Sequence, residues 1–146
     1  MRWTIIATGK PAIGWARQGI EDYLGRLHKT GAVECLYIKD GPPEEVTKRM
    51  LTASEGSLRV LLDERGRQQR STALAQWIEA RQLDGTKRVS VLIGGASGHS
   101  PALKEAVKES WSLSSLTLQH ELALLVLTEQ LYRAYSILRG EPYHRE

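Results

Sequence analysis

Short apolar runs that alternate with amphipathic stretches limit the folds open to this chain more than any other feature of its sequence. Five runs are rich in β-branched or other apolar residues, namely Trp3–Thr8, Val33–Lys39, Leu58–Asp63, Val89–Gly94 and Leu113–Leu118. Apolar residues in the stretches between these runs recur at helical spacing. Strands that alternate with helices predict an α/β fold with a mainly parallel sheet.

Residues that begin helices stand between the apolar runs. Pro43 opens the second helical stretch with two glutamates in its first turn, and the third stretch begins near Ser71. Ser100-Pro101 is a capping residue followed by proline at the first helical position. The longest stretch runs from about Glu121 to Leu138. The sequence therefore predicts five helices and five strands in a single domain, residues 1–146, without a linker.

The bulk properties of the chain restrict its setting and its partners. The longest unbroken apolar run, Leu122–Leu127, has six residues, whereas a membrane helix needs about 20. The N-terminus lacks the pattern of a secretory signal, so we expect a cytoplasmic protein without a membrane partner. A net charge of +3, from 20 basic and 17 acidic residues, excludes a uniformly basic surface. Any contact with RNA must then come from a local cluster of charges.

Cysteine and histidine give no sign of a metal site. Cys35 is the only cysteine, and its place in an apolar run predicts a buried structural thiol rather than a nucleophile. A single cysteine cannot form an internal disulfide, which fits a reducing compartment. No spacing of cysteine or histidine matches a zinc site, so we expect no metal.

Three predicted strand ends are candidate ligand sites, because α/β proteins bind ligands where parallel strands end. One strand stops after Leu62 in a charged turn, which also suits a surface loop. A second strand enters a loop at Gly94 with three glycines in five residues, where either a ligand approaches the backbone or the chain turns tightly. The third is Leu113–Leu118, which mixes leucines with hydroxyl residues as small-molecule pockets do. This run also suits an ordinary buried strand.

Taken together, these segments resemble the ribosomal RNA large subunit methyltransferase H (RlmH) family, which belongs to the SPOUT class. The resemblance runs over the whole chain and rests on the order and spacing of four segments, Ser90–Gly95, Ser110–Leu118, Glu129–Tyr135 and Pro142–Glu146. Two positions depart from many members of the family. Gln119 stands where proline is common before a histidine, and Leu124 stands where arginine is common.

The resemblance implies a fold and a cofactor that no periodicity in the sequence indicates. The implied fold is a SPOUT-type α/β domain whose C-terminal part forms a deep trefoil knot. The implied cofactor is S-adenosyl-L-methionine, bound in the knot by Leu62, Gly94, Leu113, Ser114, Ser115, Leu116, Thr117 and Leu118. The implied reaction transfers a methyl group to N3 of a pseudouridine in 23S large-subunit ribosomal RNA, with the assembled ribosome as partner.

Methyl transfer to N3 requires loss of the N3 proton, and a nearby cation favours the resulting anion. Arg133 and Arg145 are candidates for that cation, while Glu129 and His144 are candidates for accepting the proton. Tyr143, His144 and Arg145 also suit RNA, since aromatic rings stack on bases and arginine pairs with phosphate. The resemblance places this tail beside the methyl donor of a partner subunit.

The longest helical stretch bears on the number of subunits. Its apolar residues cover more than one side of a helix, which predicts burial against a second copy and hence a homodimer. Two other functions remain open. One is a SPOUT methyltransferase for another RNA, such as transfer RNA, and the other is a ribosome-binding assembly factor without catalysis. The glycine loop and the Leu113–Leu118 run argue against the second, because a simple RNA binder needs no adenine pocket.

Overall fold

The computed structural model describes residues 1–29 and 32–146, and it confirms an α/β fold built on a parallel sheet. The sheet has five strands in the order β2-β1-β4-β3-β5, and every pairing is parallel. The strands are β1 (Arg2–Thr8), β2 (Val33–Ile38), β3 (Leu58–Gln68), β4 (Arg88–Ile93) and β5 (Glu109–Ser112). Because all five strands point the same way, their carboxyl ends meet at one edge of the sheet.

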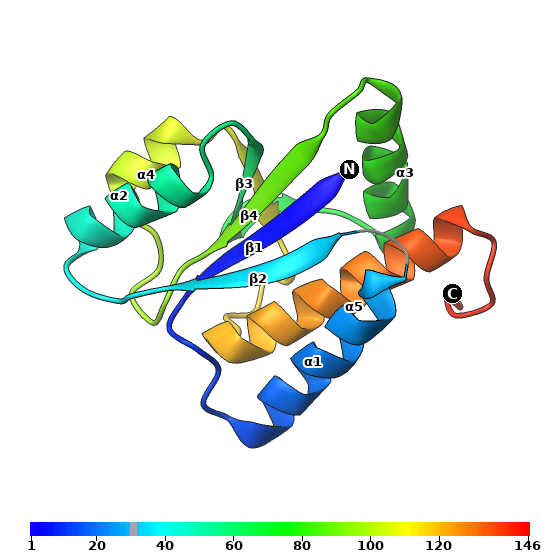
Figure 1. The fold of residues 1–146 in the computed structure, drawn as a ribbon, viewed down its shortest axis with the longest axis horizontal. Helices are drawn as coiled ribbons and strands as arrows, with labels where there is room; N and C mark the ends of the chain where they lie inside the picture. The colour runs from blue at the N-terminus through cyan, green and yellow to red at the C-terminus, as the bar shows by residue number, and fades with distance from the viewer. Residues whose placement is uncertain (30–31) are drawn as a thin grey trace.

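Helices cover both faces of this sheet (Figure 1). They are α1 (Gly14–His28), α2 (Pro43–Ala53), α3 (Ser71–Leu83), α4 (Pro101–Ala106) and α5 (His120–Leu138). The larger core joins α1, α3 and α5 to one face of the sheet, and the smaller core joins α2 and α4 to the other. Successive residues of β1 show the alternation, since Ile5 belongs to the larger core and Ile6 to the smaller. Strands covered on both faces read as continuous apolar runs, which is why they stand out in the sequence.

The predicted fifth strand is wrong in its position. Residues Leu113–Leu118 form an irregular loop, and the strand lies immediately before it, at Glu109–Ser112. The serines explain the loop, because Ser112 Oγ donates to the carbonyl of Ser114 at 2.8 Å and Ser114 Oγ accepts from Leu116 N at 3.0 Å. The buried side chain of this region is Trp111, at 2% exposure, whereas Leu116 is 73% exposed.

The capping signal Ser100-Pro101 correctly predicts where α4 begins, and a cap that the sequence analysis did not identify begins α5. Ser100 caps α4, with its Oγ accepting from Leu103 N at 3.1 Å and Pro101 in the first turn. Gln119 caps α5, since its side-chain oxygen accepts from the N–H groups of Glu121 and Leu122. The departure from proline at position 119 therefore supplies a helix cap.

Cys35 lies on β2 and packs against the larger core. Burial raises the pKa of its thiol to about 11, so the thiol is protonated at neutral pH and is a weak nucleophile. Within residues 1–29 and 32–146, no helix is both long enough and apolar enough to span a bilayer. The trefoil knot stays a prediction from the family resemblance.

Candidate cofactor and substrate site

A cavity of about 410 Å³ lies beside the middle of β3 and beyond the carboxyl ends of β4 and β5. Three segments distant in the sequence line it, which are Leu62–Arg65 within β3, the glycine loop from Gly94, and the loop after β5. Of the residues predicted to bind the cofactor, Leu62, Gly94, Leu113, Ser114, Leu116, Thr117 and Leu118 line this cavity, and Ser115 does not. The volume lies within the range typical of small-molecule sites.

The glycine loop needs glycines because its main chain packs closely against itself and against Thr8. Gly98 has φ +71° and donates its N–H to the carbonyl of Gly95 at 3.0 Å. A Cβ on Gly94 would lie 2.8 Å from the carbonyl carbon of Gly98, and one on Gly95 would lie 2.8 Å from Thr8 Oγ1. The close approach at Gly94 is therefore between two parts of the loop, which favours the tight turn of the two alternatives that the sequence left open.

The loop after β5 forms the opposite wall of the cavity. Thr117 Oγ1 donates to Glu64 Oε2 at 2.5 Å, and this contact joins the loop to the extended end of β3. Leu116 beside it stays largely exposed. An exposed leucine at the edge of a cavity gains stability when a ligand covers it. The combination of leucine side chains, hydroxyl groups and free main-chain groups suits an adenine ring, which has one polar edge and two apolar faces.

Charged side chains line the same cavity at Asp63, Glu64, Arg65 and Lys104. Asp63 forms an ion pair with Lys104, at 3.5 Å between Oδ2 and Nζ. Burial by itself raises the pKa of Asp63, but the N–H of Arg65 and the charge of Lys104 lower it overall. Asp63 is therefore an anion at neutral pH and is placed to attract a cationic ligand. The predicted end of this strand in a charged turn after Leu62 is wrong, because β3 continues through these residues to Gln68, with a shift of register against β5 between Leu62 and Arg67. The sequence also did not identify Asp63 or Lys104 as site residues.

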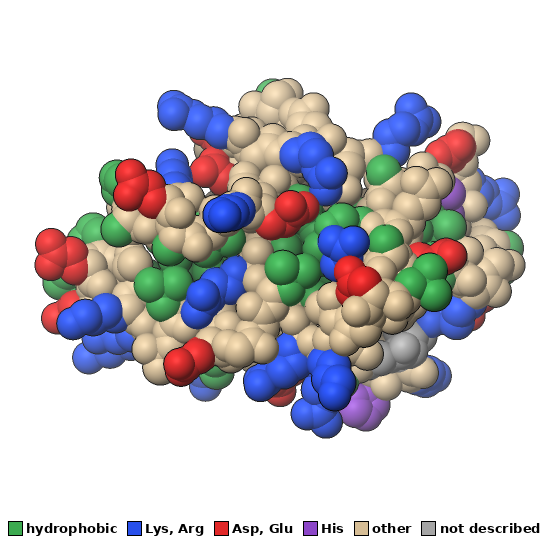
Figure 2. All heavy atoms as spheres, turned by 90° about the horizontal axis from the view of Figure 1, so that it is seen from above, with side chains coloured by type: hydrophobic (Ala, Val, Ile, Leu, Met, Phe, Trp, Pro, Cys, Tyr) green, Lys and Arg blue, Asp and Glu red, His purple; other side chains and the backbone are tan. Residues whose placement is uncertain are grey.

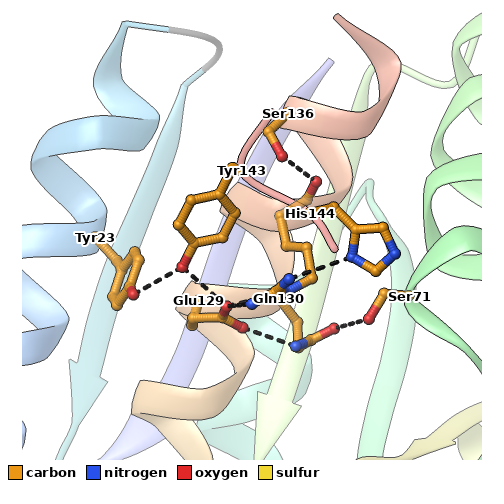
Figure 3. Close-up of polar contacts among 8 residues, drawn as sticks. Tyr23, Ser71, Glu129, Gln130, Ser136, Tyr143 and His144 are labelled. Atoms are coloured by element: carbon orange, nitrogen blue, oxygen red, sulfur yellow. Dashed lines mark hydrogen bonds and ion pairs between the residues drawn. The ribbon is translucent and has the colours of Figure 1, made fainter. Parts of the chain in front are cut away.

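A second cluster of polar side chains gathers around the C-terminal tail (Figure 3). The hydroxyl of Tyr143 donates to Glu129 Oε1 at 3.0 Å and so accepts from the hydroxyl of Tyr23 at 2.9 Å. The ring of Tyr143 packs edge-on against Tyr132, with centroids 4.7 Å apart, and the Arg133 guanidinium lies 4.8 Å from its centroid. Tyr143 is thus held by three kinds of contact, namely hydrogen bonds, edge-on ring packing and a cation–π contact.

Glu129 is the centre of this cluster. Its carboxylate accepts from Arg133 at 2.6 Å and 3.0 Å, from Tyr143, and from Gln130 Nε2 at 2.7 Å. Gln130 in turn accepts from Ser71 of α3 at 2.6 Å. The carboxylate of Glu129 therefore joins Arg133, Tyr143 and Gln130 in one network of hydrogen bonds.

His144 lies against Arg133, with 3.2 Å between Nδ1 and Nη1. A guanidinium only donates, so Nδ1 is the acceptor and the proton of the neutral ring sits on Nε2. Nε2 is buried and faces Glu146 Oε1 at 3.4 Å, with poor hydrogen-bond geometry. Arg145 is exposed and forms no hydrogen bond or ion pair with the described part of the chain.

The structure brings Glu129, Arg133, Tyr143 and His144 together, but it does not bring them to the cavity. The cavity meets α5 at His120 and Ala123, near the start of the helix. At about 1.5 Å per residue, Arg133 lies roughly 15 Å further along the same helix. No group of three or more histidine, cysteine or carboxylate side chains suited to a metal occurs within residues 1–29 and 32–146.

The chain is similar to methyltransferases over its whole length. The family described as predicted SPOUT methyltransferases matches residues 1–144. Ribosomal RNA large subunit methyltransferase H of Deinococcus radiodurans is 40% identical over 145 residues, and that of Thermus thermophilus is 41% identical; each alignment covers 99% of both chains. Among solved structures, a tRNA methyltransferase from Aquifex aeolicus matches with a TM-score of 0.59 at 14% identity, covering 100% of this chain and 76% of that chain. A likeness at that identity shows a shared fold.

Proposed function

The chain belongs to the ribosomal RNA large subunit methyltransferase H family of SPOUT methyltransferases, and we propose that it methylates N3 of a pseudouridine in 23S ribosomal RNA. The observation that carries the proposal is the cavity at the sheet edge, which unites Leu62, the glycine loop and the Leu113–Leu118 loop. These three segments are the ones through which the family resemblance implies binding of S-adenosyl-L-methionine.

The residues around the cavity fit this cofactor. Leu116 and its neighbouring leucines offer apolar contact to an adenine ring, and main-chain groups of the two loops offer donors and acceptors to its edge. Asp63 and Glu64 supply negative charge to a ligand that carries a sulfonium and an ammonium group. When bound, the cofactor supplies an electrophilic methyl group, so the protein mainly has to orient the acceptor.

The tail residues suit the acceptor side of the reaction. A guanidinium from Arg133 or Arg145 near the pseudouridine ring lowers the pKa of the N3 proton and stabilises the anion. Tyr143 and His144 can stack on or hydrogen-bond to bases. We assign Glu129 to holding Arg133 and Tyr143 in place, because its carboxylate already accepts four hydrogen bonds. His144 then remains the candidate proton acceptor, once Arg133 releases its Nδ1.

A homodimer would join the two halves of this site. Leu122, Leu125 and Val126 of α5 are only partly covered within one chain, and Trp15 of the neighbouring α1 is 58% exposed. The two helices start side by side, since Ile13 N donates to Glu121 Oε1 at 2.9 Å. A second copy packed on this apolar surface would bury it and would bring the partner's tail toward the cavity.

The substrate we propose is RNA within the large subunit or the assembled ribosome, in the cytoplasm. Figure 2 shows Lys and Arg side chains spread among Asp and Glu over the face it draws, with hydrophobic side chains between them. This distribution fits binding to a defined RNA surface on a ribosome better than indiscriminate binding to polyanions.

One experiment separates the proposed function from its alternatives. The protein and radiolabelled S-adenosyl-L-methionine are incubated in parallel reactions, each with one substrate. The substrates are assembled ribosomes, separated subunits, bare ribosomal RNA and transfer RNA. We expect label on a single pseudouridine of 23S RNA, strongest with assembled ribosomes. Label on transfer RNA alone would identify a SPOUT enzyme for another RNA. Ribosome binding without cofactor binding in calorimetry would identify an assembly factor.

A further inference from the structure

His99 occupies the wall between two cavities. It lines the cofactor cavity and also a second cavity of about 340 Å³, which lies on the α2 and α4 side of the glycine loop. The two cavities share five residues, Gly94, Gly95, Ser97, Gly98 and His99. The glycine loop therefore lies between the two cavities and lines both of them.

The imidazole of His99 ties this loop to the sheet. Its Nε2 lies 3.0 Å from the main-chain oxygen of Leu92, one residue before the end of β4. A carbonyl only accepts, so Nε2 carries the proton and donates. The pairing of β3 with β4 ends at Leu62 and Ile93. His99 therefore donates to the sheet one residue before the point where this ladder stops.

The charge state of His99 follows from its surroundings. Burial lowers the pKa of the ring, while hydrogen bonds to the carbonyls of Leu92 and Leu62 and the charge of Asp63 oppose this, and Lys104 adds to the lowering. The other charged or titratable groups facing the loop are Glu64, Arg65 and His120 in the cofactor cavity and Asp40 in the second cavity. Because the pKa is below the usual value of about 6.5, the ring is neutral at neutral pH.

We propose that His99 is a positioning residue for the methyl donor, which acts by anchoring the end of the glycine loop to β4 through its Nε2–H. The proposal rests on the proposed function, since it assigns the ligand of the cavity to be S-adenosyl-L-methionine. The anchor holds the main chain from Gly94 to Gly98 in its binding shape before the cofactor arrives. A preorganised loop binds more tightly because less order has to be imposed on binding.

Two substitutions of similar size separate the effect of the hydrogen-bond donor at position 99 from the effect of side-chain volume. In His99→Gln the amide Nε2 can reach the carbonyl of Leu92, whereas in His99→Leu no donor remains. We expect the dissociation constant for S-adenosyl-L-methionine, measured by calorimetry without RNA, to rise about 10-fold in His99→Leu and less than about 3-fold in His99→Gln. Equal losses in both variants, with unchanged melting temperatures, would overturn the proposal.

Hydrogen–deuterium exchange of the cofactor-free protein tests the anchor without any assumption about the ligand. The amides of Gly95 to Gly98 should exchange faster in His99→Leu than in the parent protein, and at nearly the parent rate in His99→Gln. Equal exchange in all three proteins would show that His99 anchors nothing. If the loop loosens as expected but the parent protein binds no S-adenosyl-L-methionine, then the proposed function fails together with the cofactor role of His99.

Discussion

The cofactor cavity and the C-terminal tail cluster are built in opposite ways. Main-chain geometry shapes the cavity, since a Cβ on Gly94 would lie only 2.8 Å from the carbonyl carbon of Gly98. Side chains shape the tail cluster, where Glu129 collects donors from Arg133 and Tyr143. The cavity should therefore be sensitive to added atoms, and the tail cluster to removed ones.

The two regions also differ in how they meet the rest of the molecule. Strand β3 and the ends of β4 and β5 border the cavity, so the sheet sets much of its shape. The tail lies on the surface of α5, roughly 15 Å along the helix from the cavity. The proposed donor site and the proposed acceptor site therefore do not touch within one chain, and the role of each can be tested by changing it separately.

The largest effect is expected from Gly94→Val. The valine side chain would collide with the main chain of Gly98, so the loop could not keep its shape. We expect the affinity for S-adenosyl-L-methionine to fall at least about 1,000-fold, or about 4 kcal/mol, in calorimetry.

Gly25→Val is the matched control, because a Cβ at Gly25 on α1 meets no atom within 4 Å. The control should bind the cofactor like the parent protein, with a similar melting temperature. Unchanged affinity in Gly94→Val would remove the glycine loop from the cofactor site.

The second largest effect is expected from deletion of Tyr143–Glu146. Chain ends usually tolerate truncation, but here the deletion removes Tyr143 and His144 from the cluster around Glu129. Methyl transfer to ribosomes should fall at least about 100-fold, a loss of roughly 2.7 kcal/mol of transition-state stabilisation. Cofactor affinity and melting temperature should stay near the parent values. A truncated protein that methylates at nearly the normal rate would show that the tail is dispensable.

The same contrast explains how much the sequence could predict. Local signals predicted β1, β2, β4, the first half of β3 and all five helices, because a cap such as Ser100 or a proline such as Pro43 acts through its immediate neighbours. The charged residues after Leu62 were mistaken for a turn, although β3 continues to Gln68. The Leu113–Leu118 loop was mistaken for a strand, since leucines that face a ligand cavity resemble leucines that face a core. The spacing of apolar residues in a sequence indicates which residues are covered, but it does not show whether the protein core or a ligand covers them.

The side-chain clusters were harder to predict than the cavity. Gly94 and Leu113 each follow a strand, so the general rule for parallel sheets brought them together, and Leu62 lies on β3 opposite the ends of both strands. The contacts of Tyr23 with Tyr143 and of Ser71 with Gln130 join residues far apart in the chain. His99 carried no signal, because one histidine in a loop has no spacing to interpret and its partner is a main-chain carbonyl.

The third prediction joins the two regions and tests whether the tail acts on a partner's cavity. Gly94→Val lacks a working cavity and the tail deletion lacks a working tail, so each homodimer is inactive. In a mixture refolded from equal amounts, half of the dimers are mixed and each has one complete site, which predicts about a quarter of the parent activity. This is a rise of roughly 25-fold over the tail deletion alone.

Light scattering is the companion measurement for the mixture. The parent protein should have about twice the chain mass of 16.3 kDa at micromolar concentration. A monomeric mass, or a mixture no more active than its components, would mean that the tail acts within its own chain or not at all.

The smallest effect is expected from Tyr23→Phe, which removes one hydroxyl from the tail cluster. That hydroxyl donates to Tyr143, whose remaining hydrogen bond to Glu129 and packing against Tyr132 are unchanged. Burial and the hydrogen bonds to Tyr23 and Glu129 raise the pKa of Tyr143, so it stays a protonated donor in the variant. Methyl transfer should fall about 3-fold, as expected for one exchangeable neutral hydrogen bond, while cofactor affinity stays constant.

Tyr37→Phe, the same change on β2 away from the cluster, should leave methyl transfer unaltered. Equal rates for the two variants would show that Tyr23 does not position the tail, and a loss as large as that of the tail deletion would show that Tyr143 depends on Tyr23 rather than on Glu129.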